Sequence, residues 1–101
     1  MRVVALVDDL MDRSKVSSAF PDAQFARDAA AADGADVVIV DLVRHGGAVE
    51  ALRAAAPGAR LVAFGPHVDA AALARARDDG ADVVVARSVF FRDPVATVTG
   101  K

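Results

Sequence analysis

The sequence predicts an α/β domain in which helices cover both faces of a parallel β-sheet. Three observations predict it: short runs of β-branched and aliphatic residues, helix-like stretches that alternate with them, and prolines or glycines that separate the two. The strand-like runs are almost unbroken in hydrophobicity, which is typical of strands buried on both faces, whereas half-exposed antiparallel strands alternate. We therefore expect a three-layer sandwich with the sheet in the middle.

Five strands are expected, and helix-like stretches lie between them. The strands are predicted at residues 3–7, 37–40, 61–64 and 83–85, with a weaker edge strand at 24–26. The helices are predicted at residues 11–20, 29–32, 49–56 and 70–79, followed by Pro21, Gly34, Pro57 and Gly80. Pro94 leaves a short, poorly helical tail after the last strand. Short right-handed connections then favour the flavodoxin-like strand order 2-1-3-4-5.

Length and composition limit the class of protein. A chain of 101 residues with 54% hydrophobic residues suffices for one core, so we expect a single domain over residues 1–101 with no output domain. The first apolar run meets Asp8 too early for a signal peptide or membrane span, and we expect a cytoplasmic protein. There is no cysteine, which excludes disulfides and thiolate zinc sites. The net charge of −2, without a basic stripe, argues against nucleic-acid partners.

Charged residues follow several of the expected strands. Asp8 and Asp9 come after the first strand, Asp41 after the third and Arg87 after the fifth. In an open α/β sheet ligands bind beyond the carboxyl ends of the strands, so these side chains are expected on one rim. Clustered carboxylates need a cation among them, and Mg²⁺ prefers such oxygen ligands. Asp41 beside a divalent ion could attack a phosphoryl donor and form an acyl phosphate.

Two alternatives use the same residues differently. Asp8 or Asp9 could cap the first helix, and Asp41 could form a bidentate ion pair with Arg87 that neutralises the rim without a metal. The loop histidines His45 and His67 could instead join the carboxylates in a transition-metal site, which would suit a small metal-binding or hydrolytic protein. Two loop histidines are more often solvated, and their spacing matches no compact ligand motif.

Three segments resemble the receiver domain of bacterial response regulators, the CheY-like family. Residues 7–10 (VDDL) look like the acidic pair that ends the first receiver strand, and residues 38–42 (VIVDL) look like the strand that ends in the phospho-acceptor. Residues 57–88 follow the pattern of many receivers without a gap, through Gly80-Ala81-Asp82 to Arg87-Ser88. The resemblance implies that Asp8, Asp9 and Asp41 hold Mg²⁺ and that a sensor kinase phosphorylates Asp41 in a two-component phosphorelay.

The chain also departs from the receiver pattern. Gly65 stands where receivers carry the Thr or Ser that binds the phosphoryl group, Val84 where they carry the switching aromatic, and Arg87 where they carry a lysine. The loop after Asp41 is short, and the first, second and fifth helices look trimmed. These departures indicate an atypical receiver, or pseudo-receiver.

Three hypotheses follow. The first is a non-enzymatic signalling module that binds another protein, a sensor kinase or a downstream protein, through the face of the fourth helix, fifth strand and tail. The second is a genuine Mg²⁺-dependent phospho-acceptor, and the third is the metal-binding or hydrolytic protein. Of Phe90 and Phe91, one ring is expected in the core and the other as an anchor or cover. Incomplete cover of the last strand would also favour a homodimer.

Overall fold

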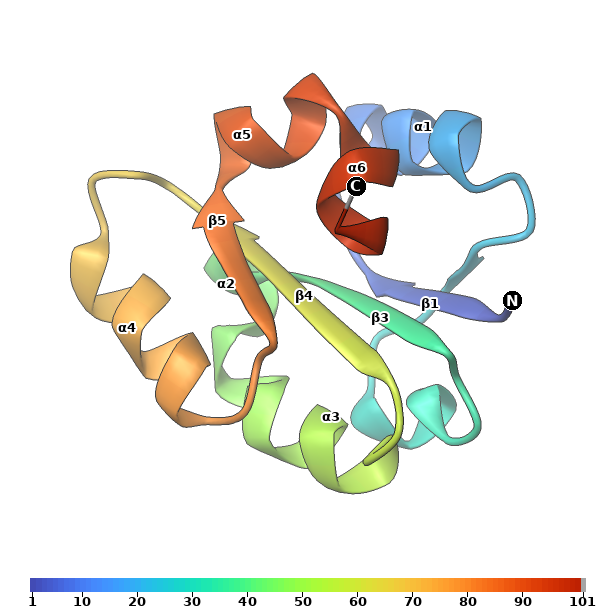
Figure 1. The fold of residues 1–101 in the computed structure, drawn as a ribbon, viewed down its shortest axis with the longest axis horizontal. Helices are drawn as coiled ribbons and strands as arrows, with labels where there is room; N and C mark the ends of the chain where they lie inside the picture. The colour runs from blue at the N-terminus through green and yellow to red at the C-terminus, as the bar shows by residue number, and fades with distance from the viewer. Residues whose placement is uncertain (101) are drawn as a thin grey trace.

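The centre of the molecule is a parallel sheet of five strands in the order β2-β1-β3-β4-β5 (Figure 1). The computed structural model describes residues 1–100. The strands are β1 (Val3–Leu6), β2 (Gln24–Phe25), β3 (Val37–Asp41), β4 (Arg60–Gly65) and β5 (Val83–Ala86). Every neighbouring pair is parallel. The predicted fold class and strand order are confirmed.

Helices cover both faces of this sheet, as Figure 1 shows. One face carries α1 (Leu10–Ala19), α5 (Arg87–Arg92) and α6 (Pro94–Thr99). The other carries the 3₁₀ turn η1 (Ala29–Ala32), α3 (Val49–Ala55) and α4 (Ala70–Asp78). The short α2 (Leu42–His45) and η2 (Gly46–Ala48) lead from β3 into α3. Among residues 1–100, no helix combines the length and the apolar character needed to cross a membrane.

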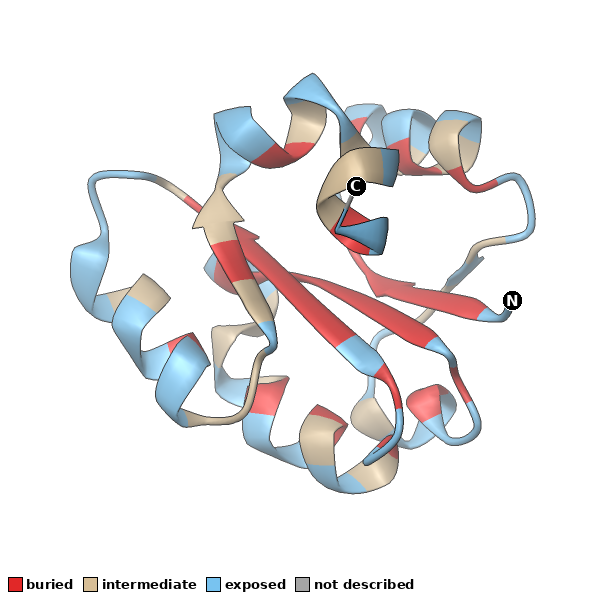
Figure 2. Ribbon diagram, viewed as in Figure 1, coloured by how far each residue is buried: buried red, intermediate tan, exposed pale blue. Residues whose placement is uncertain are grey.

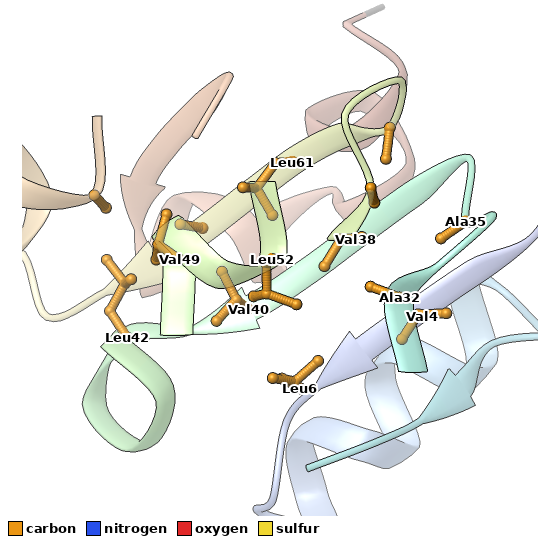
Figure 3. Packing of buried hydrophobic residues seen from close by; sticks show 14 of the residues in the cluster. Val4, Leu6, Ala32, Ala35, Val38, Val40, Leu42, Val49, Leu52 and Leu61 are labelled. Atoms are coloured by element: carbon orange, nitrogen blue, oxygen red, sulfur yellow. The ribbon is translucent and has the colours of Figure 1, made fainter. Parts of the chain in front are cut away.

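Alternate residues of the central strands pack into two separate hydrophobic cores, one on each face of the sheet. Val38 and Val40 of β3 point to the α3 side with Leu52, whereas Ile39 points to the α1 side with Val16. Figure 2 shows the buried strands between exposed outer helix surfaces, and Figure 3 shows the packing on the α3 side. Burial on both faces explains why these strands read as continuous apolar runs.

Two expectations about local structure were wrong. Residues 42–47, expected as a loop, lie in α2 and η2. Asp41 caps α2 by accepting a hydrogen bond from the Val43 backbone N–H at 3.0 Å. The tail, expected to be poorly helical, forms α5 and α6. Asp93 starts α6 by accepting a bond from the Ala96 N–H at 3.1 Å, with Pro94 at its first position.

The tail covers the centre of the sheet more fully than its edge. Phe90 and Val98 are buried, while the edge-strand residues Val83 and Val85 stay half-buried, so the predicted incomplete cover of the last strand is confirmed. Phe91, the alternative exposed anchor, is half-buried and lies edge-on to Phe64 at a centroid distance of 5.1 Å. Phe91 therefore covers the core on the α1 side and is not an exposed anchor. Lys101, the last residue of the predicted tail, lies outside the described residues.

Candidate functional site

An open pocket of about 620 Å³ lies at the carboxyl edge of the sheet. Its lining is dominated by charged side chains. It is lined by Asp8, Asp9, Asp12, Arg27, Asp41, Val43, Arg44, Phe64, Gly65, Pro66 and Arg87. The structure thus brings together the residues that the sequence places after the first, third, fourth and fifth strands. It also adds Asp12, which the sequence analysis did not single out.

Asp12 and Arg87 form a bidentate ion pair across the pocket. The two terminal guanidinium nitrogens of Arg87, Nη1 and Nη2, donate to the Asp12 carboxylate, which is 1% exposed. The expected pair between Arg87 and Asp41 is therefore wrong, because Asp12 in the first turn of α1 takes both donors. A signal for Asp12 was present in the sequence: it precedes the buried Val16 by four residues and lies on the same inner stripe of the helix.

The ring of Phe91 helps to hold the Arg87 guanidinium. The guanidinium carbon lies 4.9 Å from the ring centroid, and the Lys15 ammonium lies 5.2 Å from the same centroid. Both distances fit cation–π contacts. Arg87 and Phe91 from α5, together with Asp12 and Lys15 from α1, therefore connect these two helices beside the pocket.

Asp8 is hydrogen-bonded to a histidine, and this contradicts the expectation that both loop histidines are solvated. His45 Nε2 lies 2.9 Å from Asp8 Oδ1, and the His45 side chain is only 13% exposed. The bond to His45 lowers the pKa of Asp8, against the opposing effect of burial. His67 lies in an exposed turn and does not line the pocket, so the structure does not assemble the predicted transition-metal site.

Asp9 and Asp41 each cap a helix. Asp9 accepts a hydrogen bond from the Asp12 backbone N–H at 3.0 Å at the start of α1, as one of the alternatives expected. Asp41 is 6% exposed, and burial raises its pKa. The Val43 bond and the charges of Arg87 and His45 oppose this rise, whereas the charge of Asp12 adds to it. Burial thus makes Asp41 easier to protonate than an exposed aspartate.

The donor set of the pocket suits Mg²⁺ in chemistry, but its arrangement does not fit the ion. Carboxylate oxygens are the ligands that Mg²⁺ prefers. Asp8 is bonded to His45, Asp12 to Arg87, and Asp9 and Asp41 to backbone N–H groups. Within residues 1–100, no group of three or more His, Cys, Asp or Glu residues is placed to hold a metal ion. Asp12 uses both of its oxygens for Arg87, whereas the other three carboxylates each use one, so a divalent ion would compete with Arg87 for Asp12.

Gly65 and Val84, the two other positions that depart from the receiver pattern, are packed against neighbouring residues. A Cβ added at Gly65 would lie 3.4 Å from Leu42 and 3.5 Å from Leu73, so there is room for a small side chain but little more. Val84 is buried in the core on the α3 side, where its strand neighbour is Ala63. Neither position supplies a hydroxyl or a ring to the pocket.

Asp41→Asn is expected to stabilise the protein by about 1 kcal/mol, or roughly 4–8 °C in Tm for a domain of this size. Asparagine caps helices as well as aspartate does, while the buried charge and its repulsion with Asp12 disappear. Because burial raises the folded-state pKa, the ionised carboxylate opposes folding above that pKa. The gain should therefore be largest at neutral pH and vanish as the pH falls towards the unfolded value of 3.8.

Urea unfolding of the two proteins between neutral and acid pH measures this difference. Asp41→Ala is the matched control, because it removes the charge and the cap together and should gain less than Asp41→Asn. A loss of stability in Asp41→Asn at neutral pH would show that the ionised carboxylate stabilises the fold.

No family model matches the chain, and no curated protein matches it in sequence. Solved structures match it in fold. A CheY-like receiver domain from Methanospirillum hungatei superposes with a TM-score of 0.82 at 14% identity, covering 98% of this chain and 90% of that one. A response regulator from Burkholderia pseudomallei, with a phosphorylated aspartic acid and a calcium ion, gives 0.81 at 16% identity and 96% coverage. This chain spans 65% of that protein's length.

The same fold occurs in a protein named for a different process. A putative pilus assembly protein, CpaE, from Burkholderia thailandensis gives a TM-score of 0.74 at 16% identity, covering 99% of this chain and 96% of that one. Identities this low establish the fold alone. The chain resembles CheY-like response-regulator receiver domains, and its fold is the receiver fold.

Proposed function

We propose that the chain is an atypical receiver-like signalling module that acts by binding another protein, with neither enzymatic activity nor a phosphorylation-driven switch. One observation carries the proposal. Arg87, at the position of the receiver lysine, is held by Asp12 and Phe91 on the α1 side of the pocket. The residue that would meet a phosphoryl group at Asp41 is therefore already bound elsewhere.

The other atypical positions support the same conclusion. A ligand shifts a conformational equilibrium only by its differential affinity for the two states. Gly65 offers a phosphoryl group no hydroxyl, and moving Arg87 to it would leave the buried Asp12 carboxylate unpaired. Val84 has no ring to move inward. A phosphoryl group at Asp41 would thus gain few new contacts and disrupt an existing one.

The partner surface is proposed on α4, β5 and the tail. β5 is an edge strand whose Val83 and Val85 are half-buried, and Val89 and Val95 in the tail are exposed. Partly exposed apolar residues beside an edge strand suit a protein partner. The predicted partners for this surface are a sensor kinase, a downstream protein or a second copy of the chain.

Beryllofluoride with Mg²⁺, which mimics a phosphoryl group, is expected to change amide NMR shifts only weakly and only around the pocket. Asp41→Asn is the matched control, because it removes the acceptor carboxylate and preserves the helix cap. Large, saturable shifts that spread from Asp41 to Val84 and α4 in the unmodified chain, and vanish in the control, would show a working switch.

The second candidate function is the Mg²⁺-dependent phospho-acceptor. Asp41 favours it, because it is the pocket carboxylate on β3 and the position that resembles the family's acceptor. Incubation with acetyl phosphate and Mg²⁺, followed by intact-mass measurement, tests it. A stoichiometric gain of one phosphoryl group that is lost in Asp41→Asn would favour this candidate.

A further inference from the structure

We infer that Arg87, paired with Asp12, is the built-in cation of the acidic pocket, and that it excludes divalent metal ions from this pocket. The inference concerns the pocket and is independent of the proposed protein partner. Receivers are expected to place a metal among such carboxylates. Here the chain's own guanidinium supplies the positive charge.

The electrostatic environment of Arg87 supports this role. Its guanidinium is bonded to Asp12, and the charges of Asp41 and Asp9 also act on it. These interactions raise the pKa of Arg87 above its usual value, so the group keeps its charge at every working pH. Arg87 thus attracts three of the four pocket carboxylates at once, which is the electrostatic task of a divalent ion.

The position of the guanidinium is fixed from several sides. Asp12 is 1% exposed and accepts both donors, so releasing Arg87 would leave a buried carboxylate without a partner. Phe91 packs on the guanidinium at 4.9 Å, and its ring is held by Phe64 and Phe90 at 5.1 and 4.9 Å. A metal ion entering the pocket would have to displace a cation that the core itself positions.

The other three pocket carboxylates also accept hydrogen bonds. Asp8 is occupied by His45, and Asp9 and Asp41 by backbone N–H groups. Each of these bonds uses one carboxylate oxygen, and an entering Mg²⁺ that approached the other oxygens would meet the repulsion of the Arg87 charge. We therefore expect the pocket to accept a metal only after the cation at residue 87 is removed.

The test compares four proteins: the unmodified chain, Arg87→Met, Asp12→Leu and the double variant Asp12→Leu/Arg87→Met. Thermal unfolding is followed with millimolar MgCl₂ and with NaCl at matched ionic strength. The unmodified chain and Asp12→Leu, which both keep Arg87, are expected to show no Mg²⁺-specific change in Tm. Arg87→Met and the double variant are expected to gain stability from Mg²⁺. Once Mg²⁺ reaches about 100 times its Kd, the ratio of folded to unfolded protein should rise roughly 100-fold.

The double variant keeps the inference falsifiable if Arg87→Met alone does not fold. It replaces the ion pair with two apolar side chains and keeps Asp8, Asp9 and Asp41, so it exposes three carboxylates to Mg²⁺ without the Arg87 charge, while Arg27 and Arg44 stay in the pocket lining. Isothermal titration calorimetry with MgCl₂ gives an independent measure of binding. Saturable Mg²⁺ binding by the unmodified chain would overturn the inference, and so would a folded double variant that binds no Mg²⁺.

Discussion

Replacing Phe64 with alanine is expected to lower the free energy of unfolding by about 3–5 kcal/mol. Phe64 on β4 has 0% exposure and forms part of the pocket lining. Its ring stacks on Phe90 at 4.9 Å and meets Phe91 edge-on at 5.1 Å. The truncation would leave a cavity under α5, and it would loosen the rings that hold Arg87. Natural domains have only about 5–15 kcal/mol of stability, so this variant should lose a large fraction of it.

Phe91→Ala is the matched control for that prediction. Phe91 contacts both other rings of the cluster but is half-buried, so its removal creates a smaller cavity. Urea unfolding followed by circular dichroism compares the two variants, with an expected loss for Phe91→Ala of about 1–2 kcal/mol. A larger loss for Phe91→Ala than for Phe64→Ala would contradict the packing described for the α1 side of the sheet.

The sheet could be predicted from the sequence because its strands are buried on both faces. Runs such as residues 37–40 are apolar at every position, and the polar residues that follow them mark the carboxyl edge. The weak edge strand β2 was also found, although its two residues are exposed and half-buried. The short helix α2 and the tail helices α5 and α6 were missed. The starts of α2 and α6 depend on the side-chain caps Asp41 and Asp93 within unremarkable local sequence, and α5 starts without a side-chain cap.

The residues of the site could be predicted, but their pairing could not. The strand ends placed Asp8, Asp9, Asp41 and Arg87 at one edge, and all four line the pocket. The partner of Arg87 depends on a helix instead. Asp12 faces inward only because α1 lies with Val16 against the sheet, and this rotation of the helix is a tertiary property. The same reasoning explains His45, whose position depends on the unexpected helix α2.

Arg87→Met is expected to destabilise the protein more than the simultaneous replacement of both partners. The single change leaves the Asp12 carboxylate, 1% exposed, without a partner. Breaking a fully buried pair in this way costs about 3–5 kcal/mol, and because the Arg87 side chain is 45% exposed we expect a smaller loss, about 2–3 kcal/mol. Asp12→Leu/Arg87→Met buries no unpaired charge and should lose less than about 1 kcal/mol.

A double-mutant cycle at neutral pH, with urea unfolding of all four proteins, measures the coupling between the two side chains. The single variants should together lose more than the double variant loses, because each single variant leaves one charge behind. Lys15→Met is the control: it removes the other cation on Phe91 but leaves the ion pair intact, and it should change stability by less than about 1 kcal/mol. Additive losses for Arg87→Met and Asp12→Leu would contradict the ion pair as the connection between α1 and α5. A strong coupling would show that these two residues hold the pocket in one arrangement.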